Sequence, residues 1–524
     1  MTAKNPSDSG HATLPPLEER SVSAALIHAS ESGGSRIAVA DAQTQSTYEE
    51  LEDEAARIAG GLAAMGVRPG DLVLTMLDNH VDHVRGWFGL AVGGFVSVPV
   101  NTALKGPTLA HVINDSGASL LICEARLLDE VRAIAQDLRA LRCVIVRGEG
   151  ERAWSGVTTA SWDEVASGDR APSVDVHPWD LHSIMYTSGS TGGPKGVLVT
   201  HGQTYIRALV VPQPRDLPNP TALVTLPLFH VAGQCRGVLG PLAMGIRSVI
   251  VPRFSVSGFW SSVRAADATS TLLMGTMATF LLNRPPTDTD RDHRLEMVMM
   301  APVTDRAPEF AERFGVDVYA SYGSTEAGTV SFGRTSKSGS LGRIHPAFEA
   351  MVADEHDRPV DQGAEGELLV RAREPWLMTP GYLHRPEATV ELWRNQWLHT
   401  GDRVVEGLDG ELVFAGRAKD VIRRRGENVS PTDVEVAAKA FPGVEECVAL
   451  GVPSPESEED IKIVVIADEG TFDAAALHAY LQSVLPAFMV PKYIELVDSI
   501  PRTATEKIDK PALRAFGNGP SWSF

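Results

Sequence analysis

The sequence predicts an α/β fold with a large N-terminal domain of helix-covered parallel β-sheets and a smaller α+β C-terminal domain. Two observations predict it. From about residue 21 to residue 414, short apolar runs of buried-strand type alternate with amphipathic helical segments, which is typical of parallel sheets covered on both faces. Near Gly416 a charged, glycine-containing stretch begins, and a compact unit of roughly one hundred residues follows it.

An amphipathic helix and a series of strands define the N-terminal part. Leu51, Ala55, Ile58 and Leu62 share one face of the segment 47–66 at helical spacing. Strand-like runs follow in the order DLVLTMLD, FVSVPV, ASLLICE, CVIVRG, ALVTLP, SVIVP, STLLMG, LEMVMMAP and VDVYASYG. Each run lies beside an amphipathic segment, so we expect a repeated strand–helix unit.

The C-terminal part starts with a helix signal, because Ser430 is a good N-cap and Pro431 takes the first helical position. The strands ECVALGVP and DIKIVVIA, a helix around 474–484 and the strand KYIELVD come next. We therefore expect a disordered tail over 1–20, an N-terminal domain over 21–416, a hinge over 417–420 and a C-terminal domain over 421–524.

Composition excludes several classes of protein. Apolar residues make up 43% of the 524 residues and charged residues 22%, which is ordinary for a globular chain and excludes disorder as the dominant state. The net charge of −20 disfavours nucleic acid or a membrane surface as a partner. The four cysteines show no CxxC spacing, so neither a zinc cage nor a disulfide framework is indicated. With no signal peptide or membrane helix evident, we expect a cytoplasmic protein.

The segment IMYTSGSTGGPKGVLVTH predicts a phosphate-binding loop between two strands. Glycines let backbone N–H groups surround an anion, hydroxyls donate further hydrogen bonds, and Lys195 adds a positive charge. A Walker A loop is disfavoured, because Pro194 precedes this lysine and Gly196 follows it. The remaining loop candidates are Thr187, Ser188, Gly189, Ser190, Thr191 and Gly192.

Three further segments carry polar groups at turns. In ASYGSTEAG, Glu326 is a lone carboxylate at a strand end, suited to a Mg²⁺ carried by a nucleotide, although a helix-start Thr-Glu pair explains it as well. Asp402 follows a glycine in LHTGD, where it could accept both hydroxyls of a ribose. IPRTATEKIDK places Lys507 on a turn near the C-terminus.

Together these segments resemble the adenylate-forming (ANL) superfamily from about residue 21 to 515. SIMYTSGSTGGPKGV, LPLFHVAGQ and RRRGENVSPTDVE are most similar to its acyl-CoA synthetase branch, which includes crotonobetaine/carnitine-CoA ligase-like proteins. The resemblance implies that the N-terminal domain binds ATP and the acyl group and carries a small β-barrel-like subdomain. It also implies that the C-terminal domain is mobile.

The resemblance implies a role for each matching residue. The loop from Thr187 to Gly192, with Lys195, would hold the β,γ-phosphates of ATP. The adenine, ribose and α-phosphate contacts would come from Ala301, Pro302, Tyr322, Gly323, Thr325, Asp402 and Arg417. Glu326 would hold Mg²⁺, Lys419 would be the hinge residue, and Lys507 would bridge the substrate carboxylate and the α-phosphate. Glu506 stands before this lysine, where glycine is usual in the family.

The implied activity is an ATP-dependent carboxylic acid:CoA ligase that releases pyrophosphate and then AMP, acting on a small-molecule carboxylic acid. Transfer of the acyl group to an amine or a carrier-protein thiol is the alternative, and an inactive ligand-binding relative is a second one. Coenzyme A is the expected co-substrate. The sequence leaves the oligomeric state open, a homodimer included.

Candidates for the coenzyme A and acyl sites are less specific. Arg423, Arg424 and Arg425 beside Gly426 could bind the coenzyme A phosphates, and a solvated hairpin explains any one of these arginines equally well. The resemblance implies that LPLFH opens the helix walling the acyl pocket. The candidate lining residues are His230, Gln234, Val303 and Ser331. His230 is equally well explained as a structural histidine.

Overall fold

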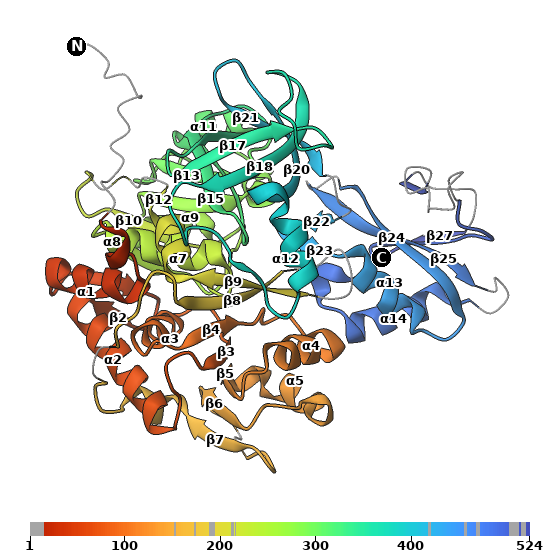
Figure 1. Cartoon of the computed structure of the whole chain (residues 1–524). Helices are drawn as coiled ribbons and strands as arrows, with labels where there is room; N and C mark the ends of the chain where they lie inside the picture. The colour runs from red at the N-terminus through yellow and green to blue at the C-terminus, as the bar shows by residue number, and fades with distance from the viewer. Residues whose placement is uncertain are drawn as a thin grey trace, which may run out of the picture.

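The structure is a computed structural model in which a large N-terminal domain is joined to a smaller C-terminal one, drawn in blue in Figure 1. It describes residues 15–150, 153–171, 174–187, 194–210, 214, 216–417, 421–454, 458–467, 472–501, 513–514 and 520–524. None of the described helices is long and apolar enough to cross a membrane.

The first sheet of the large domain has eight strands in the order β19-β9-β8-β4-β3-β5-β6-β7. Its pairs from β8 to β7 are parallel, as the strand–helix alternation predicts, and β9 is antiparallel to both of its neighbours. The strands are β3 (Leu72–Met76), β4 (Val96–Pro99), β5 (Leu120–Glu124), β6 (Cys143–Arg147), β7 (Thr158–Ser161), β8 (Leu181–Thr187), β9 (Lys195–Thr200) and β19 (Gly381–Tyr382).

The second sheet has thirteen strands in the order β17-β18-β20-β21-β16-β15-β14-β13-β12-β10-β11-β1-β2. The pairs from β14 to β1 are parallel, and the strands expected for the barrel-like subdomain are antiparallel and continue the sheet from β14. The strands are β1 (Ile37–Ala40), β2 (Gln45–Thr47), β10 (Thr221–Val224), β11 (Arg247–Ile250), β12 (Ser270–Met274), β13 (Met297–Ala301), β14 (Asp317–Ser324), β15 (Gly328–Arg334), β16 (Ser340–Ile344), β17 (Phe348–Ala353), β18 (Glu365–Ala372), β20 (Leu398–Glu406) and β21 (Leu412–Arg417).

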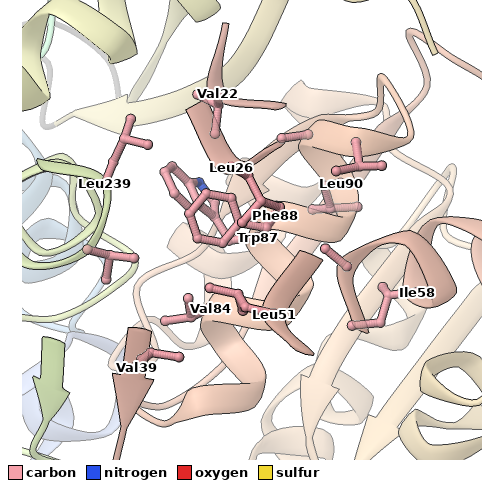
Figure 2. Close-up of a cluster of buried hydrophobic side chains, with 14 of the residues drawn as sticks. Val22, Leu26, Val39, Leu51, Ile58, Val84, Trp87, Phe88, Leu90 and Leu239 are labelled. Carbon is pink, nitrogen blue, oxygen red and sulfur yellow. The ribbon is translucent and has the colours of Figure 1, made fainter. Parts of the chain in front are cut away.

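Helices between and around the sheets bury a large apolar core. The helix predicted over 47–66 is α2 (Tyr48–Ala64), and it begins with a capping box in which Thr47 and Glu50 bond each other's backbone. Figure 2 shows Trp87 and Phe88 of α3 (Val81–Val92) gathered with leucines of α1 (Val22–Gly33), α2 and η4 (Ala232–Leu239). The other helices of this domain are α4 (Gly106–Ser116), α5 (Leu128–Ala133), α6 (Trp162–Ala166), α7 (His201–Leu209), α8 (Gly240–Ala243), α9 (Phe259–Ala266), α10 (Gly275–Leu282), α11 (Ala307–Phe314) and α12 (Pro386–Leu392).

Helix α7 lies between the two sheets. It contacts β8 and β9 of the first sheet and β15 of the second, and it packs against η4. The side chain of Thr200 caps its start by accepting a hydrogen bond from the backbone N–H of Gln203. The polar side chains of α7 are therefore placed in the interior of the domain, where they can reach loops of both sheets.

The C-terminal domain has the predicted α+β pattern. A hairpin of β22 (Ile422–Arg424) and β23 (Glu427–Val429) precedes a four-stranded sheet in the order β24-β25-β26-β27. Ser430 is the N-cap residue of α13, but its side chain makes no capping hydrogen bond. The remaining elements are α13 (Pro431–Lys439), β24 (Val444–Pro453), β25 (Glu459–Ala467), α14 (Ala474–Val484), β26 (Tyr493–Leu496) and β27 (Ser521–Ser523).

The structure describes residues 15–20 of the segment predicted as a tail. Leu17–Glu19 form a 3-10 turn, and the buried Arg20 pairs with Glu374 at 2.6 Å. Arg20 pairs with a carboxylate that is far away in the sequence, and neither composition nor a local sequence pattern indicates such a pair. Residues 1–14 lie outside the described part of the chain.

Among the described residues, polar contacts join the domains at two places. Nε2 of His230 lies 2.9 Å from Oε1 of Glu427 in the β22–β23 hairpin, and the Lys105 ammonium donates to the backbone carbonyl of Gln482 at 2.6 Å. The His230 side chain remains 41% exposed, so this ion pair is only partly shielded from water. Contacts of this kind hold an arrangement weakly and allow it to change.

We expect docking of the domains to weaken as the pH rises. Burial lowers the pKa of His230, but the charge of Glu427 and the hydrogen bond to it outweigh burial and raise the pKa above its ordinary value. The pair therefore stabilises docking fully below the ordinary histidine pKa, and this stabilisation is lost as the pH rises through the raised pKa. Small-angle scattering should show the docked fraction falling by up to about fivefold across that range.

Glu427→Gln is the matched control, because it keeps the shape of the side chain and removes its charge. In this variant the pH dependence of the scattering curve should flatten. A variant with the full wild-type dependence would show that another group controls docking.

Candidate active site

Three side chains from distant segments meet beside the predicted phosphate loop. Lys195 starts β9, and its ammonium lies 5.6 Å from the centroid of the Tyr382 ring, within the range of a cation–π contact. The Tyr382 hydroxyl donates to Oε1 of Glu326 at 2.9 Å. The structure thus links a cation and a carboxylate that two separate motifs predicted.

Sequence reasoning missed Tyr382. It lies on β19, a strand of two residues, and pairs with Val197 of β9 across the first sheet. No motif surrounds it, so only the strand pairing identifies it. Burial, followed by the charge of Glu326 and the hydrogen bond to it, raises the pKa of the Tyr382 hydroxyl. The phenol therefore stays protonated and remains a donor.

Side chains of α7 donate hydrogen bonds to the backbone of the turn that carries Glu326. The Gln203 amide donates to the backbone carbonyls of Thr325 at 3.0 Å and Glu326 at 2.9 Å. One helical turn further on, the Arg207 guanidinium donates to the carbonyls of Ser324 at 2.9 Å and Thr325 at 2.8 Å. Both donors are buried, so these bonds compete little with water and fix the turn firmly.

The predicted base and ribose residues also meet. The Tyr322 hydroxyl donates to Oδ2 of Asp402 at 2.7 Å, although the two residues lie 80 positions apart. Asp402 is in register with Arg417 across β20 and β21. This arrangement places an aromatic ring, a carboxylate and the strand position of an arginine side by side at one end of the second sheet.

The backbone near these residues is tightly packed. A Cβ on Gly323 would lie 2.0 Å from the carbonyl oxygen of Gly328, so the β14–β15 pair requires glycine there. Ala301 ends β13 in register with Met274, and the peptide bond from Ala301 to Pro302 is cis. The segment predicted to contact adenine is therefore at the end of a strand adjacent to β14.

The four acyl-pocket candidates occupy different surroundings. His230 contacts the C-terminal domain, as described above, and Gln234 is buried with neither amide atom bonded in the structure. Val303 packs in the core with α9, α10 and α11, and the buried Ser331 hydroxyl donates to the Leu341 carbonyl. Val303 and Ser331 therefore pack within the fold. Neither residue lines the small cavity that lies between η4 and the second sheet.

The three hairpin arginines also differ. Arg424 is buried, donates to the carbonyls of Phe488 and Val490 and lies 3.6 Å from Asp460, which favours a structural role over a ligand contact. Arg423 pairs with Glu458 at 3.2 Å. The turn residue Arg425 is exposed.

Gly426 follows in the same turn, with a φ of 83° that favours glycine. A Cβ at Gly426 would lie 3.0 Å from Cε of Met274, so the hairpin approaches β12 closely. The hairpin turn therefore faces the large domain near the end of the strand that adjoins β13.

Several predicted residues lie outside the described part of the chain. They are Ser188, Gly189, Ser190, Thr191 and Gly192 of the loop, the hinge residue Lys419, and Glu506 and Lys507. Thr187 ends β8 and Lys195 begins β9, so both sides of the loop are placed. Only the backbone of Arg417 is described.

The described residues contain no cluster of three or more His, Cys, Asp or Glu side chains that could hold a metal ion by itself. Among the described residues, the Tyr382 hydroxyl is the neutral donor that bonds Oε1 of the Glu326 carboxylate. One carboxylate of this kind suits a Mg²⁺ ion that arrives with nucleotide phosphates, because Mg²⁺ is usually bound by one or two carboxylates together with phosphate oxygens.

Comparisons with known proteins agree with this geometry. The AMP-binding enzyme family model matches residues 27–383, and that of the AMP-binding enzyme C-terminal domain matches residues 433–507. Crotonobetaine/carnitine–CoA ligase of Salmonella typhi is 31% identical over 483 residues, covering 90% of this chain and 93% of the relative.

Two solved structures extend the comparison. The amide bond synthetase McbA from Marinactinospora thermotolerans superposes with a TM-score of 0.82 at 23% identity, over 94% of this chain and 99% of that one. ATP-bound MatB from Rhodopseudomonas palustris superposes with a TM-score of 0.68 at 26% identity, over 94% and 98%. At 23% identity, McbA supports the fold alone. The family models and the curated relative match most of the chain, and these matches show the family. The chain therefore belongs to the AMP-binding enzyme family of the adenylate-forming superfamily.

Proposed function

We propose that the protein is an ATP-dependent carboxylic acid:CoA ligase. It forms an acyl-adenylate with release of pyrophosphate, and then transfers the acyl group to the thiol of coenzyme A with release of AMP. The observation that carries this proposal is the meeting of Lys195, Tyr382 and Glu326 beside the phosphate loop. The relatives named crotonobetaine/carnitine–CoA ligase support the choice of acceptor.

The first step brings negative groups together. A substrate carboxylate oxygen attacks the α-phosphorus of ATP, and the bond from that phosphorus to the pyrophosphate oxygen breaks. Catalysis of such a step depends on positioned donors and cations more than on a covalent nucleophile. Lys195 supplies one cation beside the phosphates and Lys507 a second beside the reacting carboxylate.

Glu326 would hold Mg²⁺, which neutralises phosphate charge when it is bound with the nucleotide. The Tyr382 hydroxyl orients that carboxylate, and α7 holds the backbone that carries it. Tyr322 and Asp402 bind the base and the ribose of the same nucleotide. The protein's part is thus to fix where the charges lie before the reaction begins.

In the second step the thiol of coenzyme A has to reach the acyl group at the position that Lys507 occupies in the first step. The coenzyme A sulfur attacks the acyl carbonyl, the bond to the AMP oxygen breaks, and the thiol proton leaves to solvent. A C-terminal domain held by weak polar contacts can rotate between the two steps. In the described arrangement the Gly426 turn lies against Met274.

Release of pyrophosphate should depend on a carboxylic acid. A screen of aliphatic, aromatic, dicarboxylic and betaine-type acids, with and without coenzyme A, measures pyrophosphate and AMP. We expect acid-dependent pyrophosphate in both arms and thioester only with coenzyme A. Pyrophosphate release that no acid stimulates would overturn the ligase assignment. Acid-dependent adenylation without thioester formation would instead indicate that the acceptor is an amine or a carrier-protein thiol.

Lys507→Ala should affect one half-reaction. We expect the rate of adenylation to fall by about 10²–10³, the usual cost of losing one donor to the transition state. Thioester formation from a supplied acyl-adenylate should remain near the wild-type rate. Equal losses in both halves would contradict the assigned role, and Lys510→Ala is the nearby lysine control.

Tyr382→Phe should weaken the hold on Mg²⁺. Losing one hydrogen bond to Glu326 costs about 1 kcal/mol, so the Mg²⁺ concentration for half-maximal adenylation should rise by roughly fivefold while kcat at saturating Mg²⁺ stays within about twofold. Tyr319→Phe removes a hydroxyl from the far end of β14 and serves as the control. A fall in kcat that Mg²⁺ cannot restore would show that Tyr382 acts in another way.

A further inference from the structure

Arg236 on η4 is a buried cation without a counter-charge among the described residues. Arg236 is only 7% exposed. Neither Nη1 nor Nη2 of its guanidinium has a hydrogen-bond partner among the described residues. Burying an unpaired guanidinium is among the most costly arrangements in a protein. Removal from water lowers the pKa of Arg236 to about 9, and the positive charge of Arg207 acts in the same direction.

Arg236 lines a small cavity between η4 and the second sheet. The cavity is about 30 Å³, which is room for roughly two water molecules or for the three heavy atoms of a carboxylate group. Most of its wall is apolar, and Arg236 is the one charged residue among the described residues that line it. The apolar wall comes chiefly from Val224, Leu226, Leu272, Met297 and Met299.

Two other buried side chains, one on α7 and one on the packed helix η4, also have polar atoms without a hydrogen-bond partner among the described residues. Nε and Nη1 of Arg207 lack partners in the structure, although its Nη2 holds the Thr325 turn. Both amide atoms of the buried Gln234 are likewise without a partner. Buried polar groups in native structures are nearly always satisfied by protein, water or a ligand, so these atoms have bonding capacity left for a bound polar group. Through its Nη2, Arg207 also bonds the turn of the candidate active site.

The helix that carries Arg236 is fixed in place. It is a π-helix, a form found frequently at functional sites. A Cβ on Gly233 would lie 2.2 Å from the Pro227 carbonyl oxygen, and one on Gly237 would lie 2.7 Å from the Val224 side chain. The helix therefore packs closely against β10 and the residues that follow it, and the guanidinium is held inside instead of reaching water.

We propose that the acid substrate is a dicarboxylic acid whose distal carboxylate binds Arg236. The inference rests on the proposed function and names its substrate class. A carboxylate matches the planar fork of a guanidinium and restores the missing counter-charge. An acid with a fixed positive charge, such as a betaine, is rejected because Arg236 repels that charge.

Matched pairs of acids test the proposal. Succinate against butyrate, and glutarate against valerate, differ by one terminal carboxylate at equal chain length. We expect wild-type kcat/KM for AMP formation to favour at least one diacid by about 10²–10³, since a buried polar site strongly rejects an analogue that leaves it unpaired. A wild-type preference for every monoacid over its diacid partner would overturn the proposal.

Arg236→Met replaces the guanidinium with an unbranched apolar side chain and removes its charge. For the preferred diacid, KM should rise by about 10² or more with a smaller change in kcat, while kcat/KM for the matched monoacid should stay constant or rise. Arg236→Lys keeps the charge without the fork and should fall between the two. Equal losses for diacid and monoacid would show that Arg236 has only a structural role.

Binding measured without turnover separates this inference from the proposed function. Thermal denaturation of the wild-type protein with succinate, glutarate, butyrate or inorganic phosphate, in the presence and absence of AMP, needs no catalytic step. Stabilisation by a diacid alone, lost in Arg236→Met, supports the site even if no acid is activated. Equal stabilisation by phosphate would mean a general anion site and would overturn the dicarboxylate assignment, as would no stabilisation by any diacid in the folded wild-type protein.

Discussion

The bonds from α7 to the turn after β14 are the constraint on which the rest of the site depends. Gln203 and Arg207 hold the carbonyls of Ser324, Thr325 and Glu326, and α7 itself lies between the two sheets. Without those donors, three buried carbonyls would lose their partners, at a cost of about 1–3 kcal/mol each. The position of the Glu326 carboxylate is thus determined by the packing of the whole domain.

The same helix explains how a strongly acidic chain can bind anions. The net charge of −20 belongs mainly to the surface, where screening reduces its reach to about one Debye length. Inside the large domain the charged groups along α7 and η4 are arginines, and burial lowers the pKa of both Arg207 and Arg236. The local charge in this low-dielectric interior is therefore opposite in sign to the net charge of the chain.

The domain arrangement depends on much weaker forces. The His230–Glu427 pair is partly exposed, and the bond from Lys105 to Gln482 is a single contact at the surface. By contrast, each domain has its own buried core, with the C-terminal one built around α13, α14 and β25. The fold of each domain therefore rests on its own core and not on the polar contacts between the domains.

Most of the fold could be predicted from local patterns. The strand runs, the helix of 47–66 with its capping box, and the helix over 474–484 all lie where the sequence indicates. Such elements depend on periodicity and capping, which neighbouring residues supply. The bond from Arg20 to Glu374 could not be predicted in this way, because its partner lies 354 positions away.

The sequence by itself determined the chemistry-bearing residue types and the family, because glycine-rich turns, a lysine and a carboxylate at strand ends are local features. Only the tertiary structure decided which of them meet. Tyr382 became part of the site through strand pairing, Arg424 was assigned to the fold by its bonds to Phe488 and Val490, and Arg236 became a buried unpaired cation. Burial and partnership are properties of packing between distant segments, so no local pattern contains them.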